Sequence, residues 1–287
     1  MKNSLPFIQP EFLKNKKILS FQSIAGGDIN TAWQITTKDQ IYFLKENREP
    51  PASDFLKIEK RGLKILEEIK TIKIPKTFEA GNHDGTAYII MEYLSTVFPE
   101  KIGWENLGRQ LAALHRKTQI HFGLDHDNYI GSLPQTNHQQ STWPEFYVLE
   151  RLIPQVKMAT DRQLLDTRDL KSFEKLYQEL VNICPEEPPS LTHGDLWSGN
   201  FLITTNQIPV LIDPAVSYTH REMDLAMTQL FGGFDSIFYD TYQSVFPLAP
   251  GFSKRIDLYQ LYYLLVHLNL FGRGYLSRVR AVIQLFI

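Results

Sequence analysis

Residues 190–213, which read SLTHGDLWSGNFLITTNQIPVLID, place the tightest limits on how this chain can fold. An apolar run at 190–192 enters a polar loop, and a second apolar run at 201–203 leaves it. A turn at 204–207 then leads back into the apolar run 210–212. This order predicts a strand, a loop and a hairpin. Such a path would bring the oxygen-bearing side chains of Asp195, Asn200 and Asp213 together.

The three residues share a spacing that is typical of phosphoryl-transfer enzymes. Any one Asp or Asn in a loop is ordinary turn chemistry, but H-x-D-x-x-x-x-N followed by an apolar strand that ends in Asp matches the catalytic-loop arrangement of kinases. Asp195 is then the candidate general base, which accepts a proton from a substrate hydroxyl. Asn200 and Asp213 are candidate ligands for one or two Mg²⁺ ions on nucleotide phosphates, because Mg²⁺ prefers hard oxygen ligands.

The composition indicates a folded globular chain of one large or two modest domains. Its 287 residues are 43% hydrophobic and 22% charged, which argues against disorder and against a coiled coil. A net charge of −2 gives no basic footprint, so no nucleic-acid partner is expected. The single cysteine, Cys184, excludes an intramolecular disulfide and favours a reducing compartment, with a semi-buried thiol at a helix end as its expected state.

The distribution of apolar residues predicts a cytoplasmic protein with no membrane partner. The N-terminus has no apolar core and no small-residue cleavage site of the kind found in export signals. The most apolar segment, residues 258–271, is interrupted by polar residues and is too short to span a bilayer. We expect it to form a buried core helix.

The N-terminal third predicts an antiparallel sheet and one main helix. Residues 53–70 alternate apolar and charged positions as an amphipathic helix does. The extended runs predict five strands, at residues 18–24, 29–37, 41–45, 76–80 and 86–91. The last two are separated by the turn 81–85 and form a hairpin that completes the sheet.

A phosphate clamp is predicted from four residues of this part. Gly26 and Gly27 lie between the first two strands, where they could bring backbone N–H groups to a phosphate or simply form a hairpin. Lys45 comes late in the third strand, where its ammonium could meet the α- and β-phosphates. Glu59 in the helix could hold that ammonium in place or be a solvated charge, and two later glutamates of the helix are its competitors.

From residue 100 onward the pattern is helical. The predicted helices cover residues 104–117, 143–157, 170–183, 222–231, 236–246, 254–271 and 278–286. Residues 122–140 are expected to be a long polar connection on the substrate side. His115, on one face of the first of these helices, is expected to be a satisfied core histidine rather than a functional one.

Several further motifs together resemble one family, the fructosamine kinases or ketosamine-3-kinases, over nearly the whole chain. The motif H-G-D-x-x-x-x-N alone is shared with aminoglycoside phosphotransferases and choline kinases, and Trp197 within it, together with the downstream motif FGGF, narrows the choice to this family. The motifs are HGDLWSGN at 193–200, MEYL at 91–94, LGRQLAALH at 107–115, IDPA at 212–215, FGGF at 231–234, APGF at 249–252 and LYQL at 258–261.

The resemblance implies a two-lobed, protein-kinase-like α+β fold. Residues 1–91 would form an ATP-binding lobe with a five-stranded antiparallel sheet, residues 92–95 a hinge, and residues 96–287 a mostly helical catalytic and substrate lobe. ATP and Mg²⁺ are the implied cofactors. Adenine would be held by the backbone of Met91, Glu92, Tyr93 and Leu94.

The implied reaction is phosphorylation of the 3-hydroxyl of a ketosamine, such as fructosamine or ribulosamine, either free or on a glycated lysine. Because such phosphorylation makes the adduct labile, the family is associated with the removal of glycation. Trp197 is the leading substrate contact, since an aromatic face suits a sugar and an amine cation, although a core role would be equally ordinary. Phe234, His220 and His267 are weaker candidates.

Three departures from related patterns bear on regulation. Gly194 stands where protein kinases have an arginine, Pro214 follows Asp213 in place of Phe-Gly, and residues 25–28 contain no cysteine. Control by activation-loop phosphorylation or by a redox-linked dimer is therefore not expected, and a monomer is favoured. Two alternatives remain open: a kinase for an aminoglycoside, choline or another small alcohol, and a nucleotide-binding pseudokinase. The second usually lacks the lysine, the base or a metal ligand, and this chain has all of them.

Overall fold

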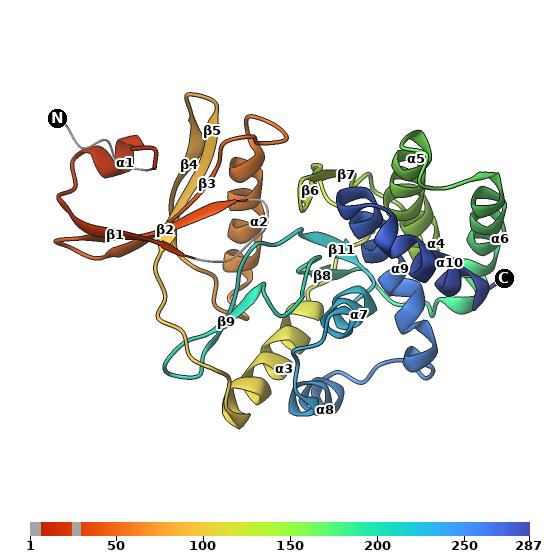
Figure 1. Ribbon diagram of the computed structural model, residues 1–287. Coiled ribbons are helices and arrows are strands. Elements are labelled where there is room, and N and C mark those ends of the chain that lie inside the picture. Colours follow the sequence, from red (N-terminus) through yellow and green to blue (C-terminus); the bar gives the residue numbers. More distant parts are fainter. Residues whose placement is uncertain (1–6, 25–29) are drawn as a thin grey trace.

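The computed structural model describes residues 7–24 and 30–287, so the predicted phosphate contacts Gly26 and Gly27 lie outside the described residues. A five-stranded sheet with α2 occupies one side of the molecule and most of the helices occupy the other (Figure 1). The sheet has the order β1-β2-β3-β5-β4 and every neighbouring pair is antiparallel, as predicted. Its strands are β1 (Ile18–Ile24), β2 (Thr31–Thr37), β3 (Ile41–Asn47), β4 (Thr77–His83) and β5 (Thr86–Glu92).

Strand β5 is apolar without interruption because both faces of the sheet are covered around it. Tyr88 and Ile90 pack with the N-terminal segment that contains the short helix α1 (Glu11–Lys14). Ile89 and Met91 point the other way and pack with α2 (Phe55–Ile69). Alternate side chains of a strand face opposite sides, so two buried faces require a continuous apolar run. The helix α2 presents its own buried face, which includes Leu63, to the same cluster.

The remaining helices form the larger part of the fold around α9, whose side chains are mostly buried. The predicted core helix at 258–271 is therefore confirmed as part of α9. The helices are α3 (Lys101–His115), α4 (Trp143–Phe146), α5 (Ile153–Asp161), α6 (Thr167–Ile183), α7 (Glu222–Leu230), α8 (Ser236–Val245), α9 (Phe252–Phe271) and α10 (Leu276–Gln284), with a 3₁₀ turn at Arg273–Tyr275. No helix among residues 7–24 and 30–287 is both long and apolar enough to span a membrane.

Short strands carry the chain through the 190–213 stretch. The predicted hairpin is present, because β9 (Phe201–Ile203) pairs antiparallel with β10 (Pro209–Leu211). The predicted strand β8 (Ser190–Thr192) pairs with β11 (Ser217–Thr219), which the sequence analysis did not anticipate. β11 is held partly by the Thr192 hydroxyl, which donates to the carbonyl of Ser217 at 2.9 Å, a contact between residues 25 positions apart that no local pattern shows.

The long polar connection predicted at 122–140 is not a loop throughout, although several of its residues line the cavity described below. This segment contains the hairpin β6 (Asn128–Ile130) and β7 (Leu133–Gln135). Three of its polar side chains are buried and satisfy one another: Asn128 accepts hydrogen bonds from Gln135 at 2.7 Å and from Asn137 at 3.0 Å. Polar composition here reflects a buried amide network, which a sequence pattern cannot distinguish from a solvated loop.

The single helix predicted at 143–157 is also interrupted, by a π-helical stretch at Tyr147–Leu152. Pro154 follows it, and proline has no N–H to give to the carbonyl four residues earlier. That carbonyl, of Glu150, instead accepts from the guanidinium of Arg151 at 3.0 Å. The wider π-helical turn therefore accommodates the proline, and the carbonyl that lacks a partner N–H still accepts a hydrogen bond.

Two single-residue predictions are confirmed. His115 is fully buried and satisfied, with its Nδ1 at 2.8 Å from the Tyr242 hydroxyl and its Nε2 at 3.1 Å from the Asp224 carboxylate. Cys184 is a partly buried free thiol at the end of α6, and burial raises its pKa to about 11. A thiol with a raised pKa is a poor nucleophile at neutral pH.

Candidate active site

The ammonium of Lys45 lies between two carboxylates contributed by different elements. Lys45 comes from β3, and its Nζ is 2.8 Å from Glu59 on α2 and 2.9 Å from Asp213, which follows β10. The predicted pairing of Lys45 with Glu59 is thus confirmed. Burial alone would lower the pKa of Lys45, but Asp213 and Glu59 outweigh it and raise this pKa, so the lysine stays charged.

Asp195 and Asn200 lie together in the loop between β8 and β9. The side-chain N–H₂ of Asn200 donates to the backbone carbonyl of Asp195 at 2.8 Å and to its carboxylate at 3.1 Å. Burial, together with the nearby Asp213 carboxylate, raises the pKa of Asp195 to about 7. A carboxylate with a pKa near neutrality is well matched to accepting a proton from a hydroxyl.

The backbone of this loop is anchored by residues that the sequence analysis missed. The buried Asp224 carboxylate of α7 accepts from the N–H of His193 at 2.7 Å and of Gly194 at 2.8 Å. Tyr263 of α9 donates its hydroxyl to the carbonyl of Gly194 at 3.0 Å. The one sequence signal for Asp224 is its place among apolar neighbours in a helix, where a charge needs a partner.

Gly194 is required by its backbone conformation and by its neighbour. Its φ is +85°, and a Cβ at this position would lie 2.0 Å from the carbonyl oxygen of Ala215. We predict that Gly194→Ala lowers the free energy of unfolding by about 2–5 kcal/mol, the sum of the left-handed penalty and the overlap. Chemical denaturation of the two proteins measures this difference.

Gly85 provides the matched control for that prediction. Its φ is +80°, and a Cβ there would meet nothing within 4 Å. Gly85→Ala should therefore cost only the backbone penalty, about 1–2 kcal/mol. Equal losses in the two variants would show that the overlap with Ala215 is relieved without cost.

The donor set formed by Asn200 and Asp213 fits a divalent cation. Because Asn200 uses its amide nitrogen as a donor to Asp195, its amide oxygen is the atom left to face a metal. Asp213 has a φ of +52°, which turns the chain after β10 and brings its carboxylate beside Lys45, while its side chain remains 38% exposed to the cleft. Both residues line the same cavity, and their hard oxygens are ligands that Mg²⁺ accepts.

A cavity of about 640 Å³ extends from these residues between α2, the β6–β7 hairpin and α9. Trp197 lines it with 38% of its surface exposed, and its indole lies across Gly199, where a Cβ would come within 2.3 Å of the ring. Gly199 is therefore needed for this orientation of the tryptophan. His267 also lines the cavity, so two of the four predicted substrate residues face the same space.

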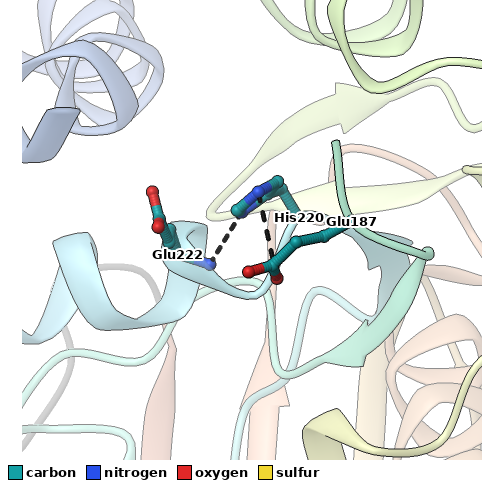
Figure 2. A group of neighbouring side chains, drawn as sticks. All are labelled: Glu187, His220 and Glu222. Atoms are coloured by element: carbon teal, nitrogen blue, oxygen red, sulfur yellow. Dashed lines mark hydrogen bonds and ion pairs between the residues drawn. The ribbon is translucent and has the colours of Figure 1, made fainter. Parts of the chain in front are cut away.

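The structure does not bring the other two, His220 and Phe234, to the surface of this cavity. His220 is 0% exposed and lies between Glu187 and the start of α7 (Figure 2). Its ring stacks on Tyr259, and burial lowers its pKa to about 4. Phe234 is partly buried and packs against Phe201, a core residue, with ring centroids 4.9 Å apart. Both residues have polar residues or glycines as sequence neighbours, which is typical of functional sites. In the structure their side chains instead pack against other side chains and stabilise the helical part of the fold.

The two glutamates beside His220 do not form a metal centre, although their carboxylates and the ring lie close enough for one. Glu187 is bound by the guanidinium of Arg221 at 2.7 and 2.9 Å. Glu222, beside His220 in Figure 2, is bound by that of Arg255 at 2.6 and 2.8 Å. Two bidentate arginine pairs already satisfy these carboxylates and would repel a cation.

The predicted hinge follows β5, which lies between β3 and β4 in the sheet. Met91 and Glu92 end β5, where the N–H of Glu92 donates to the carbonyl of Lys76 at 2.9 Å. The N–H of Tyr93 donates to the carbonyl of Ile41 at 3.4 Å, and Leu94 continues toward the helical part. Residues 91–94 stand outside the described lining of the 640 Å³ cavity, so adenine binding at the hinge stays a prediction.

Comparison with known sequences identifies the family. The profile of the family described as fructosamine kinase matches residues 2–287. A probable ketoamine kinase of Lactiplantibacillus plantarum is 43% identical over 263 residues, which cover 90% of this chain and 91% of that protein. The chloroplastic protein-ribulosamine 3-kinase of Arabidopsis thaliana is 39% identical and is covered over 83% of its length by 94% of this chain.

Solved structures agree on the fold. A protein of Thermobifida fusca provisionally named a fructosamine-3-kinase superimposes with a TM-score of 0.84 at 34% identity, with 94% of each chain covered. The aminoglycoside phosphotransferase APH(4)-Ia gives a TM-score of 0.63 at 17% identity, with 94% of this chain and 95% of that one covered, and shares the protein-kinase-like fold. This chain belongs to the fructosamine kinase family and is a phosphotransferase.

Proposed function

We propose that this protein transfers the γ-phosphoryl group of ATP to the 3-hydroxyl of a ketosamine, either free or on a glycated lysine, and so acts in deglycation. The observation that carries the proposal is the arrangement of Asp195, Asn200 and Asp213 beside the Lys45–Glu59 pair, at one end of a 640 Å³ cavity. The names of the relatives supply the acceptor class. The plant relative is named for the 3-position of ribulosamine.

Each residue has one task in this reaction. Asp195, with a pKa raised to about 7 by burial and by Asp213, accepts the proton of the attacking hydroxyl. Lys45 stays protonated between two carboxylates, and its ammonium contacts the phosphates of the nucleotide. Asp224 and Tyr263 hold the loop backbone, so the Asp195 carboxylate keeps its position through the transfer.

Asn200 and Asp213 would hold Mg²⁺. When bound, this ion neutralises charge on the transferring phosphoryl group. Trp197 would cover one face of the sugar, because an exposed indole packs well on C–H groups. We also propose that residues 1–91 and 96–287 act as lobes that close on the nucleotide about residues 92–95.

The test is a transfer assay with Mg-ATP and four acceptors: fructosamine and ribulosamine, each free and linked to lysine. Formation of the 3-phosphate, located by NMR, is the expected result. Absence of product with all four acceptors would refute the proposal. Choline and an aminoglycoside serve as comparison acceptors, because kinases of this fold also act on other alcohols, and turnover of these alone would reassign the substrate. A cytoplasmic location stays a prediction, since the plant relative is named as chloroplastic.

A further inference from the structure

One wall of the cavity is formed by aromatic side chains that have no role in the proposed phosphoryl transfer. His267 lies at the centre of this wall, with its ring centroid 4.9 Å from Phe231, 5.5 Å from Phe271 and 5.2 Å from Tyr275. Phe231 follows α7, His267 and Phe271 lie one turn apart on α9, and Tyr275 ends the 3₁₀ turn. All four line the cavity that contains Asp195. We call them the aromatic wall.

Two of these rings are exposed to an extent that core packing does not explain. Phe231 is 45% and Phe271 is 52% exposed. Exposed π faces that surround a cavity favour a cation, because the face of an aromatic ring is electron-rich. The composition of the wall therefore selects for positive charge as well as for apolar surface.

The tautomer of His267 is fixed by its own helix. Its Nδ1 is 2.8 Å from the carbonyl oxygen of Tyr263. A carbonyl oxygen can only accept, so Nδ1 carries the hydrogen and Nε2 of the neutral ring carries a lone pair. Burial lowers the pKa of His267, which keeps the ring neutral. Within the part of the chain that the structure describes, Nε2 has no hydrogen-bond partner, and it is not among the fully buried atoms that lack one. Nε2 therefore keeps accessible surface, in a residue that lines the cavity.

Each carboxylate that lines the cavity already has another partner or another role. Among its described lining residues the acidic side chains are Glu59, Asp195 and Asp213, all at the catalytic end. Glu59 and Asp213 bind Lys45, and Asp195 is needed by the acceptor hydroxyl. A cationic group of the acceptor must therefore be recognised without a counter-ion. A neutral imidazole acceptor inside a ring of π faces provides such recognition.

We propose that the aromatic wall binds the protonated amine of the ketosamine, with His267 Nε2 accepting an N–H of that ammonium and Phe231, Phe271 and Tyr275 facing its charge. This inference rests on the proposed ketosamine acceptor and adds the residues that distinguish it from an ordinary ketose. It makes His267 a specificity-determining residue, because a substrate with an uncharged group at the same place would leave the lone pair unpaired.

The experiment compares two acceptors that differ by one atom: 1-deoxy-1-butylamino-fructose and the ether in which oxygen replaces the amine nitrogen. Binding of each to the full-length protein is measured by calorimetry with a non-hydrolysable ATP analogue and Mg²⁺, and turnover with Mg-ATP is measured beside it. Wild type should prefer the amine. His267→Phe, which keeps a ring and loses the acceptor, should weaken amine binding roughly 10- to 100-fold and ether binding by less than about 3-fold.

Further variants separate recognition from structure. His267→Gln restores an acceptor and should recover part of the preference. Phe271→Leu removes a π face at an exposed position and should weaken amine binding about 2- to 5-fold. Phe98→Leu, at a phenylalanine that is 94% exposed and outside the cavity lining, is the matched control and should change neither acceptor.

The outcomes separate this proposal from the proposed reaction. Equal losses for amine and ether in His267→Phe, or no preference in wild type, would overturn the ammonium site even where phosphorylation is observed. Selective binding of the amine without any transfer would overturn the reaction and leave the site standing.

Discussion

Asp195→Asn should lower kcat by about 10²–10⁴-fold, the usual effect of losing a general base, while the affinity for Mg-ATP stays nearly unchanged. The reason is geometric. The Asp195 carboxylate accepts from Asn200 at 3.1 Å, whereas the lysine that would meet the nucleotide is held by Glu59 and Asp213. Removing the base therefore leaves the phosphate clamp intact. Steady-state kinetics give kcat, and calorimetry with Mg-ATP gives the affinity.

A matched control for this variant is Asp240→Asn, at an exposed position of α8. It carries the same chemical change outside the cavity and should leave kcat within a factor of about two. Less than a tenfold loss in Asp195→Asn would exclude Asp195 as the base. An equal weakening of nucleotide affinity would instead indicate that the carboxylate holds the metal.

The catalytic centre could be predicted from sequence because its spacing is local. Asp195, Asn200 and Asp213 lie within nineteen positions. The strands between them are short and form a hairpin, which brings the three side chains close together. The sheet could be predicted for a related reason, since the apolar run of β5 needs two covered faces. Lys45 and Glu59 are fourteen positions apart, and a strand followed by an amphipathic helix brings them together.

The residues of the site that were not predicted are placed by contacts between elements far apart in the sequence. Asp224 reaches the loop at Gly194 across thirty positions, and Tyr263 reaches it across sixty-nine. The aromatic wall exists only because α7 and α9 place Phe231 beside His267. His220 illustrates the opposite error, since a histidine close to the catalytic stretch in sequence is buried in the core, where it stacks on Tyr259 and its Nδ1 accepts from the N–H of Glu222 at 3.3 Å. Residues that are close in the sequence were enough to predict the catalytic group. Which other side chains line the cavity depends on how distant helices pack together.

Lys45→Met should lower kcat/KM for ATP on the order of 10²–10³-fold, the range found when one preorganised electrostatic partner is removed. It should also destabilise the fold. The lysine is 7% exposed and neutralises Glu59, which is 10% exposed, so its loss leaves a buried carboxylate beside Asp213. Breaking a buried pair typically costs 3–5 kcal/mol, and about 3 is expected because Asp213 is partly open to solvent. Kinetics with varied ATP and chemical denaturation measure the two effects.

A second substitution separates the two roles of Lys45. Lys45→Met/Glu59→Gln removes the unpaired charge, so the double variant should regain at least about 1 kcal/mol of unfolding free energy without regaining activity. The matched control is Lys64→Met, which breaks an exposed pair with Glu68 on the same helix, at 3.7 Å, and should cost less than about 1 kcal/mol. Equal destabilisation by Lys45→Met and Lys64→Met would contradict a buried ion pair. Recovery of activity in the double variant would mean that Lys45 acts by neutralising Glu59 and not by meeting the nucleotide.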